Sequence, residues 1–170
     1  SSLLSGGCNL DVICGEDDGW GIVDDYRDII QSVAVISTGG GTFCTGFLIN
    51  NALQDCTPYF MTAFHCGITA SNDQSLVAYW NYQNSFCRQP GSSQSGQNGD
   101  GVLSDFNTGS TLRAAYSPSD FTLVEFDDPI SETADAFFAG WSNEDIEPTS
   151  SIAVHHPSTD EKRISFEEAP

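Results

Sequence analysis

The sequence predicts an all-β fold of antiparallel strands, arranged as a sandwich or a barrel. Seven short segments are rich in β-branched and aromatic residues, and turn-forming residues bound each of them. Helical segments are scarce, and many short strands with polar turns are typical of sandwiches and barrels. The expected strands are 33–36, 47–49, 59–61, 76–80, 111–116, 121–126 and 151–154.

The first three strands follow one another closely. Residues 33–36 form an apolar run, and the turn-forming Gly39–Gly41 separates this run from the strand at 47–49. Asn50-Asn51 marks the next turn, which leads to the strand at 59–61. Turn-forming residues therefore separate these three expected strands from one another.

The remaining strands surround a long polar segment. Residues 24–31, before the first strand, are expected to form a helical turn or two. The strand at 76–80 ends before residues 89–101, whose Gly, Ser, Gln and Asn predict a long exposed loop. Two apolar strands, 111–116 and 121–126, follow this loop.

Acidic residues dominate the charge of the chain, with 24 Asp and Glu against 5 Lys and Arg and a formal net charge of −19. Nucleic-acid binding requires a basic surface, so we expect no such partner. Acidity of this kind favours solubility in a salty or extracellular setting. Attraction of cationic substrates is the alternative, and acidity spread along the whole chain supports it only weakly.

No run of about 18 apolar residues occurs, so we expect no membrane span. The chain begins without Met and without a basic or apolar leader, which indicates a mature or excised segment.

Its six cysteines indicate an oxidising, extracellular compartment and up to three disulfides. The spacing of Cys and His does not favour a zinc site, and we expect no cofactor.

The run Tyr59–Gly67 contains the strongest functional signal. An apolar strand leads to Thr62, His65 follows the strand end, and Cys66 comes directly after it, with Cys44 on the preceding strand. A histidine beside apolar residues often has only a structural role. A general base must be held rigidly, however, and these neighbours favour that function for His65.

Asp120 is the candidate partner of His65. A histidine base needs a buried carboxylate that holds its tautomer and stabilises the imidazolium. Asp120 directly precedes the apolar strand 121–126, from which its side chain can reach inward. The alternative is that it ends a turn after Pro118, which is the usual role of Asp, and spacing alone leaves both open. Weaker candidates, in more polar settings, are Asp105, Asp127 and Asp128.

Several blocks of sequence, spread along the whole chain, together carry a resemblance to a known family. They are residues 8–14, 44–51, 59–67, 79–87, 98–101, 119–125, 139–141, 152–157 and 161–165. In this order they resemble the bacterial lysyl endopeptidases, a secreted branch of the trypsin-like serine proteases.

The resemblance implies a trypsin-like architecture of two antiparallel β-barrels, with His65 as general base and Asp120 as the acid that orients it. Residues 1–130 would then form the complete first barrel, which carries both residues. Residues 131–170 would form the crossover and the first strands of an incomplete second barrel. The chain would be the N-terminal portion of such a protease.

The resemblance also implies disulfides between Cys44 and Cys66 and between Cys14 and Cys87. The first would close a loop of about 22 residues and stabilise the fold by about 3 kcal/mol. In the family, the counterpart of Cys8 bonds to a cysteine near the C-terminal end of the protease, and Cys56 is an addition to the pattern. These two cysteines pair with each other, find partners beyond Pro170, or stay free.

A serine nucleophile is not found in the sequence. Trypsin-like proteases use the chain order His, Asp, Ser. The serine-rich residues 90–96 precede Asp120, and we interpret them as a loop. None of the later serines lies in a Gly-x-Ser-Gly setting; they are Ser131, Ser142, Ser150, Ser151, Ser158 and Ser165.

Two functional hypotheses remain open. In the first, the chain is part of a secreted endopeptidase that cleaves polypeptides after basic residues, and a C-terminal portion, on a separate chain or a missing segment, supplies the serine. Lysine specificity is implied only by the resemblance. In the second, the chain is a protease-like domain without catalysis, kept for binding or as a structural subunit.

Other polar clusters do not predict a metal site. His155 and His156 are adjacent on an expected strand, so their side chains point to opposite faces. The acidic clusters at 16–18 and 24–25 lack the alternating ligands of a calcium loop. We therefore assign no metal ligand in this sequence.

Overall fold

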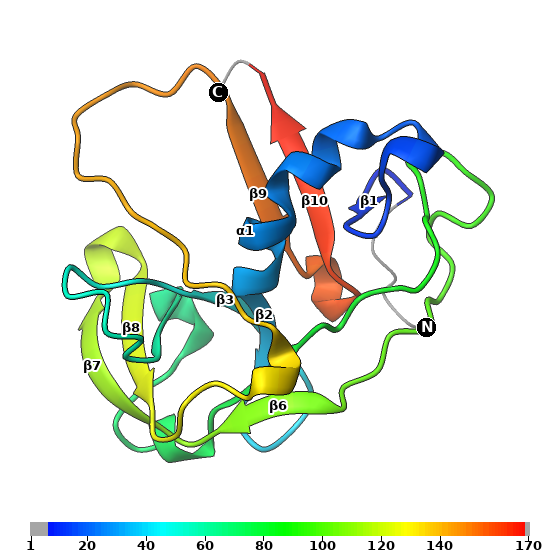
Figure 1. The fold of residues 1–170 in the computed structure, drawn as a ribbon. Helices are drawn as coiled ribbons and strands as arrows, with labels where there is room; N and C mark the ends of the chain where they lie inside the picture. The colour runs from blue at the N-terminus through cyan, green and yellow to red at the C-terminus, as the bar shows by residue number, and fades with distance from the viewer. Residues whose placement is uncertain (1–6, 169–170) are drawn as a thin grey trace.

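Antiparallel β-strands form the body of the structure, a computed structural model that describes residues 7–168 (Figure 1). The strands are β1 (Leu10–Asp11), β2 (Val33–Ser37), β3 (Cys44–Leu48), β4 (Tyr59–Thr62), β5 (Val77–Trp80), β6 (Asp105–Thr108), β7 (Ser110–Tyr116), β8 (Phe121–Phe126), β9 (Ser151–His155) and β10 (Arg163–Glu167). One sheet has seven strands in the order β6-β5-β2-β3-β4-β8-β7, and the other has three in the order β1-β10-β9. The expected all-β antiparallel class is confirmed.

In the described part of the chain, helical structure is limited to one α-helix, α1 (Arg27–Ser32), and short 3₁₀ turns. The residues expected to form a helical turn, 24–31, lie across α1 and the 3₁₀ segment that precedes it. The 3₁₀ segments are Glu16–Asp18, Gly21–Tyr26, Phe64–Cys66, Asp73–Ser75, Ser117–Ser119, Glu132–Ala134 and Pro157–Thr159. Within residues 7–168, no helix is long and apolar enough to cross a bilayer.

Each of the seven expected strands is present, and three others were missed. The strand expected at 47–49 begins earlier, at Cys44. The missed strands are β1, which has only two residues, β6, in which Phe106 is the one apolar residue, and β10, in which polar and apolar residues alternate. Such strands lack the concentration of β-branched residues that predicted the others, and β1 finds its partner, β10, far away in sequence.

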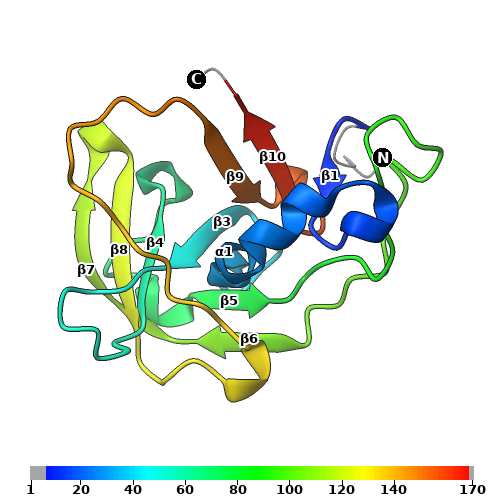
Figure 2. The ribbon, with the colours of Figure 1, turned by 45° about the horizontal axis from the view of Figure 1, so that its top comes forward.

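The seven-stranded sheet curls, so that β7 and β8 stand upright at the left of Figure 2 while β5 and β6 run across its lower part. One face is buried, because alternate residues of β4, β5 and β8 point inward. Phe60, Trp80 and Phe126 meet there edge-on, with ring centroids 5.4–6.4 Å apart. The inner face therefore forms one apolar core.

Gly46 in β3 permits the close approach of Phe60 to the sheet. A Cβ atom at this position would lie 2.2 Å from Cε1 of the Phe60 ring. No side chain larger than hydrogen fits at that distance. The Gly in the middle of β3 is thus required by the aromatic core.

The three-stranded sheet has an apolar cluster of its own. The β9–β10 hairpin pairs Arg163 with His155, and β1 joins the other side of β10, where Leu10 faces Ile164. Leu10 and Ile164 pack with Ile30 of α1, which lies between the two sheets in Figure 2. Because β1 and β10 pair, this sheet combines residues from both expected parts of the chain, and the division at residue 130 stays a prediction.

A long connection joins the two sheets. Ala139 forms a parallel bridge to Ile49, and residues 140–150 beyond it are exposed throughout. This segment, orange in Figure 1, arches from the larger sheet to β9.

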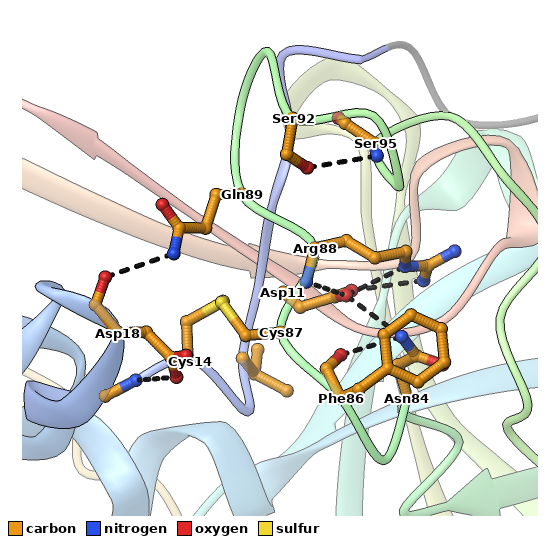
Figure 3. The surroundings of a disulfide bond; sticks show 12 residues. Asp11, Cys14, Asp18, Asn84, Phe86, Cys87, Arg88, Gln89, Ser92 and Ser95 are labelled. Atoms are coloured by element: carbon orange, nitrogen blue, oxygen red, sulfur yellow. Dashed lines mark hydrogen bonds and ion pairs between the residues drawn. A yellow bond between two sulfur atoms is a disulfide. The ribbon is translucent and has the colours of Figure 1, made fainter.

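A buried ionic cluster joins β1 to β10 of the same sheet and to the loop after β5. Arg88 donates from Nε to Asp11 Oδ2 at 2.8 Å (Figure 3). It also donates from Nη2 to Glu161 Oε2 at 2.9 Å, and its side chain is fully buried. Arg163, also fully buried, lies with Nε 3.0 Å from Asp11 Oδ1. Asn84 donates to the same Asp11 carboxylate at 3.3 Å. Charges removed from water must be paired in this way.

We expect Arg88→Ala to lower the free energy of unfolding by about 3–5 kcal/mol, since it removes the cation beside buried Glu161 and leaves buried Asp11 with Arg163 alone. The measurement is a urea unfolding curve. Arg113→Ala is the matched control, because the Arg113–Glu125 pair is partly exposed and its loss costs less than about 1 kcal/mol. Equal effects of the two substitutions would contradict this account of the cluster.

Candidate active site

The pairing of β4 with β8 brings His65 and Asp120 to one edge of the larger sheet. The two strands are antiparallel, and Thr62 at the end of β4 pairs with Thr122 near the start of β8. His65 follows β4 in the turn Phe64–Cys66, and Asp120 directly precedes β8. Residues 55 positions apart in sequence therefore meet where one strand ends and the other begins.

Two hydrogen bonds join the Asp120 carboxylate to His65. Oδ2 lies 2.7 Å from the ring Nδ1, and Oδ1 accepts the His65 backbone N–H at 2.8 Å. The first bond selects the tautomer with hydrogen on Nδ1, which leaves a lone pair on Nε2. The second fixes the turn that carries the ring. One carboxylate thus sets both the protonation and the position of the imidazole.

Asp120 also terminates the turn before β8. Its backbone N–H donates to the Ser117 carbonyl at 3.1 Å, and it adopts a left-handed conformation with φ of 51°. Asp tolerates this conformation better than most residues. The two roles that spacing left open, turn ending and contact with histidine, are therefore combined in one residue.

The pKa of the Asp120 carboxyl is lowered, chiefly by the hydrogen bond from the His65 backbone N–H and next by the bond from its ring. The carboxylate is thus favoured over the neutral acid. Both side chains are open to solvent, with exposed fractions of 72% for His65 and 52% for Asp120. A carboxylate that orients a catalytic histidine is usually buried, so this face of the site is uncovered.

A disulfide between Cys44 and Cys66 clamps the turn that carries His65. It joins the first residue of β3 to the residue after His65, with the two Cα atoms 6.1 Å apart. Thr62 adds a second tie, because its buried hydroxyl donates to the Thr45 carbonyl at 2.8 Å. The turn is therefore fixed on the side of β3 and on the side of Asp120.

Two hollows lie beside the histidine–aspartate pair on the open face of β4 and β8. The first, of about 370 Å³, has Asp120 and Val154 in its wall. The second, of about 340 Å³, shares Met61 and Phe121 with the first and has an almost wholly apolar lining that includes Trp141. Apolar surface of this extent, next to the pair, favours burial against another part of a protein.

Comparison with known proteins agrees with this geometry. The family model described as "Lysyl endopeptidase, C-terminal domain" matches residues 4–170. The chain belongs to the lysyl endopeptidase family. The lysyl endopeptidase of Pseudomonas aeruginosa strain PAO1 is 27% identical over 164 residues, which are 95% of this chain and 34% of that protein. The chain spans about a third of the length of this relative.

Membership of the lysyl endopeptidase family makes the chain a protease-related domain. The matched description is of the family's C-terminal domain, whereas the sequence blocks implied the N-terminal portion of a protease. Both descriptions would hold for a chain that forms the first part of that domain.

The other cysteines lie away from the histidine. Cys14 and Cys87 form the second disulfide, with Cα atoms 4.8 Å apart (Figure 3). Cys8 and Cys56 are both exposed and are not bonded to each other. Two groups of three potential metal ligands occur among residues 7–168, but disulfide sulfurs supply two ligands in each and are not thiolates.

The serines do not complete the site within the part of the chain that the structure describes. None of them donates a hydrogen bond to the His65 ring among residues 7–168. The serine-rich loop instead lies beside the Cys14–Cys87 disulfide, where the Ser95 backbone N–H donates to the Ser92 hydroxyl (Figure 3).

His156 was not assigned a role from sequence, and the structure buries it at the junction of the two sheets. Its ring stacks on Tyr82 with centroids 5.8 Å apart, and Nδ1 lies 2.9 Å from the Asp160 carbonyl. Burial lowers the pKa of His156 to about 3, so its ring stays neutral. Its backbone N–H donates to the Thr45 hydroxyl at 3.1 Å, which ties β3 to the second sheet.

Some of these contacts had a signal in the sequence. The Thr62 hydroxyl lies in the run that pointed to His65, so its place near the site could have been anticipated. The Thr45–His156 bond joins residues 111 positions apart, and no local pattern predicts it.

We expect the double substitution Cys44→Ser with Cys66→Ser to lower the free energy of unfolding by about 3 kcal/mol, because the bridge closes a loop of 22 residues. Denaturant unfolding under oxidising conditions measures this loss. The control is Cys56→Ser, which removes an exposed thiol outside both disulfides and should change stability by less than about 0.5 kcal/mol. A loss no larger than the control's would show that the clamp contributes little.

We expect His65→Ala to raise the pKa of the Asp120 carboxyl while leaving it below the ordinary value for Asp. The ring bond is lost, whereas the backbone N–H of residue 65, the larger cause of the shift, remains. A carboxyl-carbon NMR titration of the wild type and the variant measures both values. A variant pKa equal to that of the wild type would show that the ring does not stabilise the carboxylate.

Proposed function

We propose that this chain begins the catalytic domain of a secreted serine endopeptidase that cleaves polypeptides after lysine. The 2.7 Å contact between His65 Nδ1 and Asp120 Oδ2, at an edge clamped by a disulfide, is the observation that carries the proposal. In this function His65 is the general base and Asp120 is the residue that orients it. Family membership supports the protease parent.

The geometry supports a simple division of labour. Asp120 holds hydrogen on Nδ1, and the free Nε2 takes the proton of a serine hydroxyl as that oxygen attacks the substrate carbonyl. The imidazolium that forms is stabilised by the adjacent carboxylate and then returns the proton to the leaving amine. The disulfide and the hydrogen bond from the His65 backbone N–H to the Asp120 carboxylate hold the ring rigidly, which keeps the base within reach of the serine.

The serine belongs, in this proposal, to a C-terminal portion that follows this chain or accompanies it as a separate chain. Residues 1–130 form the first barrel, and residues 131–170 form the crossover and the first strands of the second. The open apolar face beside Asp120 supports such a cover, because the two hollows there would become the contact with the missing part. Partners for Cys8 or Cys56 are also expected in that portion.

A second candidate function is a protease-like domain without catalysis. The absence of a serine contact to His65 within residues 7–168 favours it. The doubly bonded Asp120 carboxylate favours catalysis, since a binding module does not require an oriented imidazole. A fluorophosphonate probe on the parent protein separates the two, because it labels only an activated serine.

We expect His65→Ala and Asp120→Asn, each made in the parent protein, to lower kcat for a lysyl ester by about 10⁴-fold or more. Members of a triad act as a unit, so the double variant should lose little more than either single one. The control is Asp128→Asn, which neutralises an exposed Asp beyond β8 and should keep full activity. Asp128 was also a weaker candidate for the acid. The comparison of Asp120→Asn with Asp128→Asn therefore decides which of the two aspartates orients His65.

Three further results bear on the proposal. An arginyl ester hydrolysed as fast as the lysyl ester would remove the lysine specificity but keep the protease. Full activity of His65→Ala would overturn the role assigned to the histidine. No labelling of the wild-type parent protein would favour the domain without catalysis.

A further inference from the structure

The chain contains one lysine, Lys162, and the structure buries it. Lys162 as a whole residue is 1% exposed, and its Nζ donates to the Ile30 carbonyl of α1 at 2.9 Å. The backbone is engaged as well, since the Lys162 N–H donates to the Tyr82 carbonyl at 2.9 Å and the Lys162 carbonyl accepts from Val12. Neither the side chain nor the peptide bond that follows it is accessible.

The four arginines are also withdrawn from solvent or paired. Arg88 and Arg163 are fully buried within the ionic cluster around Asp11. Arg27 lies against Asp24 and also donates to the carbonyls of Val12 and Cys14. Arg113 in β7 pairs with Glu125 of β8 at 2.7 Å. Every basic side chain of the chain is thus buried or bound to a carboxylate.

The exposed connections, in contrast, contain no basic residue. Residues 140–150 are exposed throughout and carry only acidic charges, at Glu144, Asp145 and Glu147. The loop 89–101 lacks Lys and Arg altogether. Exposed loops of small and polar residues are where proteases cut folded proteins. The two segments most open to attack therefore offer no lysine.

We propose that the placement of its single lysine makes this chain resistant to cleavage by the enzyme of which it is a part. The inference rests on the lysine specificity proposed above. A protease acts on an extended segment that fits its cleft, so a bond beside Lys162 is cut only after the strand opens. The rate then follows the small population of that open form.

An acidic composition explains the scarcity of lysine in another way, as a means of solubility. That explanation makes no distinction between a buried and an exposed lysine. Nor does it predict that an added lysine creates a site of self-cleavage while an added arginine, with the same charge, does not. This difference is the basis of the test.

The experiment installs one exposed lysine in the active parent protein, as Asp145→Lys or, in the second loop, as Gln94→Lys. The matched controls are Asp145→Arg and Gln94→Arg, which make the same change of charge. Each purified protein is incubated alone, and fragments within residues 1–170 are identified by mass spectrometry. We expect a new cut directly after the installed lysine, loss of most of the intact chain, and no cut in the wild type or the arginine variants.

A second arm separates this inference from the proposed function. The same variants, each carrying His65→Ala to stop their own activity, are treated with the lysyl endopeptidase of Pseudomonas aeruginosa. A cut only at the installed lysine supports the protective placement even if the parent protein proves inactive on a lysyl ester.

Three outcomes would overturn the inference. The first is a cut after Lys162 in the folded wild type. The second is an intact chain for both lysine variants, which would show that exposure is not what limits cleavage. The third is equal cutting of the lysine and arginine variants.

Discussion

The register between β4 and β8 is the constraint on which the rest of the site depends. It places the end of one strand beside the beginning of the next, so that the turn holding His65 faces Asp120. A shift of one residue would move the inward side chains of β8 to the outer face. Burial of Phe60 against Phe126 opposes that shift. Core packing therefore fixes the distance between His65 and Asp120.

The chain uses two kinds of stabilisation in two places. An aromatic core supports the larger sheet, while a buried ionic cluster around Asp11 and Arg88 joins β1, the loop after β5 and β10. Buried ion pairs contribute less to stability than apolar packing of equal volume, but a broken pair is costly. The cluster thus specifies how β1 meets β10, two strands far apart in sequence.

The open face beside the site links structure to function. An orienting carboxylate works best away from water, yet Asp120 is half exposed and lines the first of the two hollows. The same surface is apolar where Met61 and Phe121 line both hollows. In the proposed function, this surface packs against the portion that carries the serine.

The sequence by itself determined the all-β class, the family and the candidate pair, because strand composition is local and the run around His65 is distinctive. Only the tertiary structure decided that Asp120 both ends a turn and binds His65, since both roles fit the same spacing. It also decided that Arg88, Lys162 and His156 are buried. Their partners lie on distant segments, and the burial of a charge depends on the whole fold rather than on its neighbours in sequence.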